Sequence, residues 1–469
     1  MNFALVSLSI PLFTGLLLLM IPRYGGPWVV LSSTLSLAAA VASLVEVVDS
    51  GNQAVLLGGW PELLAIRLHL EPINALLLAF TALIQLLVSL YWSRNCRNDG
   101  FWALASLLHA TLAALWLSGD LFNWYVTLEL LSLVSVSMVA LAGKDSIKPA
   151  LNYLFLSLLA SLCYLLGVAI IYGRYGVLDF QILSRMTVGD TSTAMAMLLM
   201  TLGLMVKGAL WPLHLWLPPA HSRAPTAVSA LLSALVVKGP LFILTLLWTR
   251  MAPMELTDKG GEFLAVMGVF ALLVGGWCSF RTPLLKEMVA YSTVAQLGYV
   301  MLALGLMLQW QLRETLVALW LFVLAHGLAK TSMFLAAGEM QRIFGNKRVT
   351  ALRGASQTAP VAMFAFAVAG GSLIGLPPSG GFLAKWLLLE PLFYDLQRWP
   401  LAFAVLLSTL VSAAYVFRIV TLAFDRAERG QAPSRDRVSE WLALLPALLV
   451  WGMALVSEPL ILWLTRVAQ

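Results

Sequence analysis

The sequence predicts an all-α polytopic membrane protein with about fourteen transmembrane helices, and three observations support this. Hydrophobic residues fill 60% of the 469 positions and charged residues only 11%, so a soluble fold could not bury this much apolar surface. The apolar residues form separate segments of about 20 residues, the length at which a helix crosses a hydrocarbon core. The segments are too long and too uniformly apolar for barrel strands, and helices pair their own backbone groups in lipid.

The predicted spans divide into four regions along the chain. Residues 1–100 hold the first three spans, at 3–22, 27–48 and 72–92. No basic residues precede the first span, so we expect a retained helix and not a cleaved signal. Residues 101–248 and 263–424 hold five spans each, and residues 441–469 hold the last. These eleven spans are 101–118, 121–142, 149–172, 192–220, 226–248, 263–280, 288–308, 315–337, 359–388, 401–424 and 441–464.

Spans 7 and 12 are predicted to be broken helices. Both are near 30 residues long and carry internal prolines, at Pro212 and at Pro377 and Pro378, which remove a backbone donor and clash with the preceding turn. Each proline break lies at a similar distance from the start of its five-helix group, so spans 4–8 and 9–13 are interpreted as two copies of one unit. Since five crossings is an odd number, the second copy must be inverted, as in transporters whose broken helices line a polar cavity.

The basic residues predict how the spans are oriented. The seven connections on one side of the membrane hold sixteen Lys or Arg, whereas the six on the other side hold seven. The positive-inside rule makes the richer side cytoplasmic, so both termini are expected outside a bacterial-type inner membrane. The net charge of +6 reflects this orientation, and no basic cluster predicts nucleic-acid binding.

Four lysines and one glutamate inside predicted spans are candidates for moving charge, because a charge at the centre of a membrane helix costs roughly 2.5 to 3.5 kcal/mol on insertion scales. Lys207 stands five residues before Pro212, where carbonyls freed by the break are candidates to hold its ammonium group. Glu129 is its expected partner, because opposite charges within about 4 to 6 Å keep each other ionised. The alternatives are a lysine that only caps the broken helix and a static buried ion pair.

Three further lysines and a histidine extend this set. Lys238 lies halfway along its span, too deep to snorkel easily to either interface. His326 and Lys330 are four residues apart on one helix face, which suits a proton relay, and the alternative is a polar pair that pins helix packing. Lys385 follows the second break and is the expected terminus of a half-channel.

No motif for chemistry on a bound substrate is present, neither a G-x-S-x-G elbow nor a phosphate-binding glycine loop. Cys96, Cys163 and Cys278 lack the spacing of iron–sulfur or zinc sites, so we expect no metal and no cofactor. His109, alone in its span, is expected to be a core histidine with its hydrogen bonds satisfied. The pattern favours transport over catalysis.

Four sequence runs carry a family resemblance that extends over essentially the whole chain. They are 119–123 (GDLFN), 207–238 from Lys207 through the WPLHLWLPPAH run to Lys238, 290–299 (AYSTVAQLGY) and 375–382 (GLPPSGGF). Together with the pair of His326 and Lys330, they resemble the antiporter-like proton-conducting subunits. These subunits are shared by respiratory complex I, the multisubunit Mrp sodium/proton antiporters and the membrane-bound hydrogenases.

This resemblance implies a fourteen-helix core, other membrane subunits as partners, and protons, with Na⁺ in an antiporter, as the transported ions. It implies Glu129 and Lys207 as a coupling ion pair and Lys238, His326 and Lys330 as a central relay. It implies Lys385 as the end of the exit half-channel, although some members carry glutamate there. The length and the contexts of residues 119–123 and Lys238 are similar to the D-type member of the Mrp antiporters.

Other functions make different predictions. A subunit of a complex I-like or hydrogenase pump would move protons in response to electron transfer in its partners. A quinone-binding redox subunit would need a pocket beside cofactors, and the chain offers no cofactor ligands. An assembly scaffold would tolerate neutral residues in place of the buried charges, and their insertion cost argues against it.

Overall fold

The structure is a computed structural model that describes residues 2–57, 66–95, 100–425 and 435–467. Within these residues, twelve helices are long and apolar enough to cross a membrane. Two shorter apolar helices, Thr191–Lys207 and Pro360–Ile374, begin the two segments that were predicted to be broken. The predicted all-α polytopic membrane fold is confirmed, and Cys96 lies outside the described residues.

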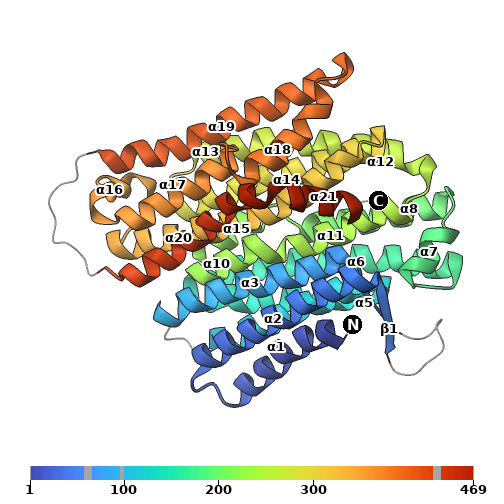
Figure 1. Ribbon diagram of the computed structural model, residues 1–469, viewed down its shortest axis with the longest axis horizontal. Coiled ribbons are helices and arrows are strands. Elements are labelled where there is room, and N and C mark those ends of the chain that lie inside the picture. Colours follow the sequence, from blue (N-terminus) through green and yellow to red (C-terminus); the bar gives the residue numbers. More distant parts are fainter. Residues whose placement is uncertain (1, 58–65, 96–99, 426–434, 468–469) are drawn as a thin grey trace. The chain divides into compact units, whose positions relative to one another are not determined.

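The chain divides into two compact units, of which the first comprises Met1–Ala209 and Leu235–Asp258. Its elements are α1 (Asn2–Met20), α2 (Gly25–Ser50), β1 (Gln53–Leu57), β2 (Ile66–Leu70), α3 (Pro72–Asn95), α4 (Gly100–Leu117), α5 (Leu121–Ala140), α6 (Lys144–Tyr175), α7 (Phe180–Met186), α8 (Thr191–Lys207), α11 (Lys238–Leu246) and the π-helical turn η2 (Leu247–Met251). Helix α4 packs against α1, α3 and α5. Helix α6 packs against α5 and α8 (Figure 1).

Aspartate caps set where three helices of this unit begin. The side chains of Asp120, Asp179 and Asp190 each accept a hydrogen bond from the backbone N–H three residues later, at the first turns of α5, α7 and α8. Such caps satisfy one of the unpaired amides of a helix start, and each contributes roughly 1 kcal/mol. The polar residues between the apolar spans therefore define the helix boundaries.

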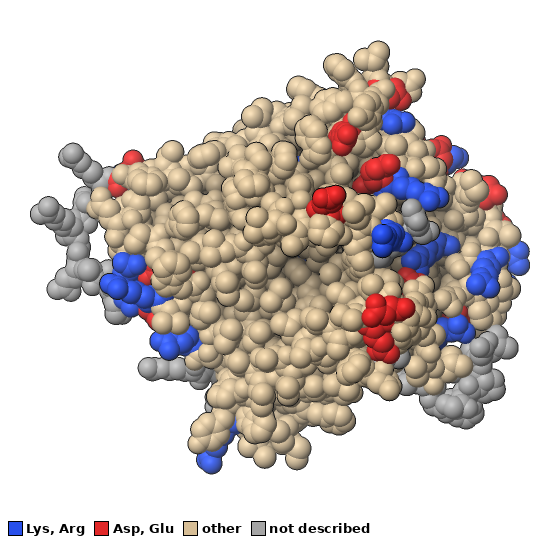
Figure 2. All heavy atoms as spheres, in the orientation of Figure 1, with Lys and Arg blue, Asp and Glu red and all other residues tan. Residues whose placement is uncertain are grey.

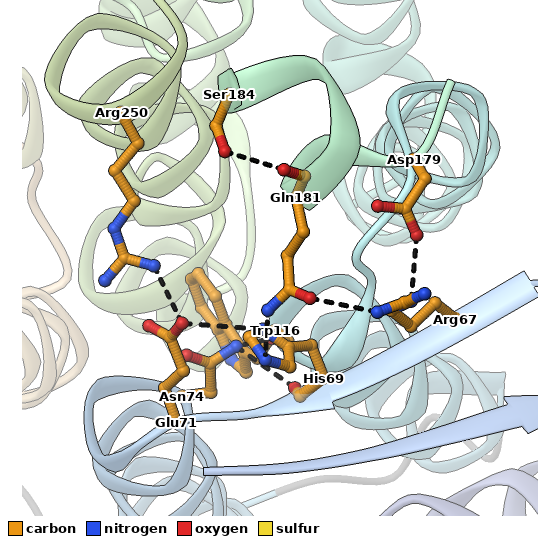
Figure 3. Close-up of polar contacts among 9 residues, drawn as sticks. All are labelled: Arg67, His69, Glu71, Asn74, Trp116, Asp179, Gln181, Ser184 and Arg250. Carbon is orange, nitrogen blue, oxygen red and sulfur yellow. Dashed lines mark hydrogen bonds and ion pairs between the residues drawn. The ribbon is translucent and has the colours of Figure 1, made fainter. Parts of the chain in front are cut away.

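A β-hairpin follows α2, and it was not predicted from the sequence. Strands β1 and β2 pair antiparallel, with Gln53 opposite Leu70 and Leu57 opposite Ile66. The only local sign is the alternation of apolar residues with Arg67 and His69 in β2, which is shorter than the pattern needed to assign a strand. The hairpin places both polar side chains beside the ends of the membrane helices (Figure 3).

The second unit comprises Leu210–Ala234 and Lys259–Gln469. Its elements are α9 (Leu217–Arg223), α10 (Thr226–Leu231), most of η1 (Leu232–Val236), most of α12 (Met254–Phe270), η3 (Ala271–Gly275), α13 (Gly276–Arg281), α14 (Leu285–Trp310), α15 (Arg313–Phe344), η4 (Val349–Leu352), α16 (Ala355–Thr358), α17 (Pro360–Ile374), α18 (Gly380–Leu389), η5 (Glu390–Leu392), η6 (Leu396–Arg398), α19 (Trp399–Phe424), α20 (Arg437–Gly452), η7 (Met453–Val456) and α21 (Ser457–Val467). Helix α15 is buried along nearly its whole length and packs against α14, α17, α18 and α20.

Glycines let α12 approach α14 at two levels. A Cβ added at Gly268 would lie 2.8 Å from the carbonyl oxygen of Gly298, and one added at Gly261 would lie 2.9 Å from that of Gly305. Real Cβ atoms do not come this close to a backbone oxygen, so any larger residue must push the helices apart.

We expect Gly268→Ala to destabilise the protein by about 1 to 3 kcal/mol, because the added methyl group overpacks this crossing. Gly173→Ala in α6 is the matched control, since a Cβ there meets nothing within 4 Å and alanine favours a helix. Thermal unfolding of the purified protein measures both variants. Equal melting temperatures for the two would contradict the close crossing.

The surface of the protein suits a membrane. On the face drawn in Figure 2, a wide area carries no Lys, Arg, Asp or Glu, and charged side chains gather toward its margins. Large apolar side chains such as Phe155, Leu159 and Leu162 of α6 are exposed. An apolar surface of this size is stable against lipid or against other membrane subunits.

Candidate functional site

Both proline breaks lie in short non-helical segments that separate two helices. The Trp211–Pro212 and Pro377–Pro378 peptide bonds are both cis. Helix α8 ends at Lys207 and α9 begins at Leu217, while α17 ends at Ile374 and α18 begins at Gly380. Each break therefore places a helix end inside an apolar segment, and the last carbonyls of such an end lack partners within their own helix.

Lys207 and Glu129 form the predicted ion pair in the first unit. The Lys207 ammonium group lies 3.4 Å from Glu129 Oε2. It also donates to Ser132 Oγ at 2.8 Å, to Ser157 Oγ at 2.9 Å and to the Leu128 carbonyl at 3.3 Å. Since an ammonium group has three protons, the neutral oxygens can hold it while the long contact to the carboxylate opens. The geometry permits both a closed and an open pair.

The structure corrects two details of this pair. The described partners of Lys207 lie on α5 and α6, whereas the carbonyls at the Pro212 break were the candidates predicted from the sequence. Glu129 is only half-buried, with 20% of its side chain exposed, and Ser161 donates a short hydrogen bond to its Oε2. The serines were not predicted, although Ser157 and Ser161 are four residues apart within an apolar span.

Lys238 also belongs to the first unit, at the start of α11, where its side chain is buried. The π-helical turn η1 comes directly before it in the chain. Such turns interrupt the regular backbone ladder and often occur at functional sites. The sequence predicted a deep lysine but not this local change of helix type.

Lys330 lies at the middle of α15 in the second unit, fully buried, with His326 one turn earlier. Its ammonium group donates to the Val289 carbonyl at 2.9 Å and to the hydroxyl of Ser292, both on α14. Thr293 donates to the same carbonyl at 3.2 Å and lies 2.9 Å from Ser233 Oγ of η1. A row of polar contacts therefore reaches from Lys330 to Ser233 within the second unit.

Lys385 caps the second break. Its ammonium group donates to the carbonyls of Leu373 at 2.8 Å and Ile374 at 3.0 Å, which are the last residues of α17, and lies 4.5 Å from the centre of the Tyr299 ring. Gln296 donates to the same Leu373 carbonyl at 3.3 Å. Helix α14 therefore presents one polar face, with Ser292, Gln296 and Tyr299 at helical spacing, between Lys330 and Lys385.

This face of α14 could have been predicted from the sequence. Residues 290–299 were noted there only as a family motif, yet their polar members recur every three to four residues in an otherwise apolar span. Lys286, which had been counted as a loop residue, is buried in the first turn of α14 and donates to the Ala224 carbonyl at 3.1 Å. A basic residue near a helix end does not reveal by itself whether it faces water.

The predicted residues are divided between the two units of the chain. Glu129, Lys207 and Lys238 lie in the first unit, and His326, Lys330 and Lys385 lie in the second. His109 is buried in α4, as expected of a core histidine, but its Nε2 atom has no hydrogen-bond partner within the described part of the chain. Among the described residues, no group of His, Cys, Asp and Glu could hold a metal ion.

Comparisons of the sequence find one protein family. A family profile described as NADH:quinone oxidoreductase/Mrp antiporter, TM, matches residues 118–412. The chain is 32% identical to the N subunit of the NADH-quinone oxidoreductase of Desulforudis audaxviator, over 97% of this chain and 95% of the relative. It is 28% identical to the D-type component of the Na⁺/H⁺ antiporter of Bacillus subtilis, over 95% and 91%.

Comparisons of the structure find the same fold in chains of several membrane assemblies. A chain of the Mrp complex from Dietzia sp. DQ12-45-1b matches with a TM-score of 0.89 and 22% identity, over 100% of this chain and 97% of that one. A chain of the archaeal membrane-bound sulfane sulfur reductase matches with a TM-score of 0.91 and 24% identity, over 100% and 98%. At these identities the likeness concerns the fold.

Proposed function

This chain belongs to the NADH:quinone oxidoreductase/Mrp antiporter membrane family, and from that membership and the site geometry we propose that it translocates protons as one subunit of a multisubunit membrane complex. In this proposal Glu129 and Lys207 form the coupling pair. Lys238, His326 and Lys330 form the relay, and Lys385 ends the exit path. Any redox chemistry lies in partner subunits, and the chain lies in a bacterial-type inner membrane with both termini outside.

The observation that carries the proposal is the polar face of α14 in the second unit. Lys330 contacts Ser292, and Gln296 shares the Leu373 carbonyl with Lys385. Side chains that donate and accept hydrogen bonds at one-turn intervals can hold the water and protons that a relay needs, inside an otherwise apolar bundle. Lysines buried only to stabilise helix packing would not need a continuous row of polar side chains between them.

Two driving forces fit a subunit of this kind. A cation gradient would drive an Mrp-type antiporter, which is the version we favour from the residue contexts around Lys238 and residues 119–123. Electron transfer in partner subunits would drive a complex I-like pump, and the 32% identity to an N subunit of an NADH-quinone oxidoreductase supports that version. Purification of the intact complex from its native membrane separates them, because the pump would carry redox subunits.

We expect Lys330→Ala to lower proton translocation at least tenfold, about 1.4 kcal/mol in the barrier, because it removes the proton carrier at the middle of α15. Lys259→Ala, at an exposed lysine of α12, is the matched control and keeps wild-type transport. The measurement is proton movement in vesicles that contain the complete complex, followed with a pH-sensitive dye and normalised to subunit content. Wild-type transport by Lys330→Ala would overturn the proposal.

A further inference from the structure

A polar network joins the hairpin to α7 and η2 at one end of the first unit (Figure 3). Arg67 of β2 pairs with Asp179 at 2.9 Å and donates to Gln181 Oε1 of α7 at 2.9 Å. Glu71, which follows β2, accepts from Arg250 of η2 at 2.7 Å. By the predicted orientation, these residues lie at the outer face of the membrane.

His69 lies at the centre of this network, and its partners define its protonation. Because arginine can only donate, Gln181 Oε1 is the acceptor of Arg67, and Gln181 Nε2 donates to His69 Nε2 at 2.8 Å. The ring proton of His69 is then on Nδ1, which faces Glu71 Oε1 at 3.5 Å. His69 is neutral in this arrangement, and its Nε2 atom can accept a proton if the Gln181 side chain moves away from it.

Burial and the neighbouring charges together set the pKa values of His69 and Glu71. Burial lowers the pKa of His69, against the raising effect of Glu71, while Arg250 and Arg67 lower it further and Asp179 raises it. Burial also raises the pKa of Glu71, but the hydrogen bond and charge of Arg250 outweigh this, so that the pKa of Glu71 is lowered. The network therefore pairs an ionised carboxylate with a neutral imidazole.

Polar side chains continue from this network into the membrane along one face of α3. Asn74 donates to the Trp116 carbonyl of α4 at 2.5 Å and to the His69 carbonyl at 3.3 Å. The Trp116 indole donates to Thr81 at 2.9 Å. Gln85 follows one turn after Thr81 and donates to Ser89 at 3.4 Å. All the polar members of this face of α3 are buried.

Helix α4 supplies polar residues at the matching levels. Trp116, near the end of α4, contacts Asn74 and Thr81 near the start of α3, and only four residues connect the end of α3 to the start of α4, so the two helices run antiparallel. Seven residues are two helical turns, about 10.5 Å, so His109 lies on the same face as Trp116 and at the level of Gln85. Ser106, one turn further, lies at the level of Ser89. We call Asn74, Thr81, Gln85, Ser89, Ser106 and His109 the polar seam.

Three buried atoms of the polar seam have no hydrogen-bond partner among the residues that the structure describes: Gln85 Oε1, Ser106 Oγ and His109 Nε2. Unpaired buried polar atoms are rare, and water is their usual partner where several lie together. Since these three atoms fall at neighbouring levels of two facing helices, one cluster of water molecules can serve all of them.

We propose that the polar seam between α3 and α4 is a hydrated proton path that leads from the network around His69 to His109 inside the membrane. Water bridges the three unpaired atoms, and His109 and His69 accept and release protons at its two ends. Metal cations fit poorly, because the seam itself holds no carboxylate and the nearby Glu71 is engaged by Arg250.

The seam adds a second path beside the residues proposed above. Helix α4 packs against α11, where a Cβ at Gly239, next to Lys238, would lie 3.0 Å from a Leu115 methyl group. His109 lies less than two turns before Leu115 on α4. The delivery of protons toward Lys238 rests on the proposed function, whereas the presence of water in the seam does not.

The hydration of the seam is tested by thiol reactivity in the complete complex. Ser106→Cys and the control Leu108→Cys, an equally buried position off the seam, are placed in a background in which Cys96, Cys163 and Cys278 are serine. Methyl methanethiosulfonate is small and uncharged and reacts with thiolates, which form only where water reaches the sulfur. We expect Ser106→Cys to react at least tenfold faster, and equal rates would overturn the hydrated seam.

The proton path is tested by His109→Phe, which keeps the ring volume and removes both nitrogens. We expect proton translocation to fall at least fivefold at normal subunit content, and unchanged transport in a complex whose Ser106→Cys variant reacts rapidly would overturn the path. If His109→Phe does not assemble, Gln85→Leu provides the same test. Failure of the proposed function would leave the thiol result unchanged, so the two outcomes are distinguishable.

Discussion

A Lys207→Met variant is expected to lose proton translocation by about a hundredfold or more, the scale on which a positioned proton carrier acts. Methionine fills a similar volume but cannot bind the serines, the Leu128 carbonyl or Glu129. Glu129→Gln is expected to lose transport to a similar extent. Without the carboxylate, the Lys207 ammonium group can no longer form and break an ion pair.

A double variant distinguishes a working pair from a static one. Removal of one partner of a buried pair costs about 3 to 5 kcal/mol, and less here because Glu129 exposes 20% of its side chain. In the double variant Glu129→Gln with Lys207→Met no charge is left unpaired, so assembly and thermal stability should recover. Proton translocation should not recover.

The measurement follows proton uptake and thermal unfolding of the same preparations. Lys144→Met, at an exposed lysine of α6, is the control for loss of a positive charge near these helices. Recovery of transport in the double variant would show that the pair serves stability alone. Normal transport in Lys207→Met would remove this pair from the mechanism.

The second large effect is expected at Lys385, where two substitutions distinguish its contribution to stability from its contribution to proton translocation. Lys385→Met removes the donor to the Ile374 carbonyl, while the Leu373 carbonyl keeps Gln296. An unsatisfied buried acceptor costs about 1 to 3 kcal/mol, so this variant should lose stability as well as transport.

Lys385→Arg keeps donors at the break but carries a guanidinium group, which does not release its proton in proteins. We expect stability close to wild type together with loss of proton translocation. Melting temperature and dye-monitored transport of the complete complex measure the two properties, with Lys259→Arg as control. Wild-type transport by Lys385→Arg would mean that Lys385 only caps the broken helix.

The sequence predicted the helices and their breaks well because both have local causes. Apolar length sets a membrane helix, and the prolines at Pro212 and Pro377 cannot continue one, so neither inference needs tertiary contacts. The hairpin of β1 and β2 was missed because five-residue strands carry too little pattern, and Lys286 was misplaced because its charge sits near a helix end.

The sequence could not predict which polar side chains contact the buried lysines. Serines and glutamines occur in many membrane helices, and their spacing does not tell which neighbour they face. Gln296 and Ser157 became meaningful only when packing placed them beside Lys385 and Lys207. The unpaired Nε2 of His109 is likewise a property of its described neighbours.

By itself the sequence determined an all-helical membrane protein with two broken helices and a set of charges inside the bilayer, because insertion costs and backbone pairing act on each segment separately. Tertiary structure decided what those charges touch. Lys207 is held by serines beside Glu129, Lys385 by the carbonyls of the second break, and Lys330 by the polar face of α14. Such contacts join residues far apart in the chain, so they depend on how the helices pack.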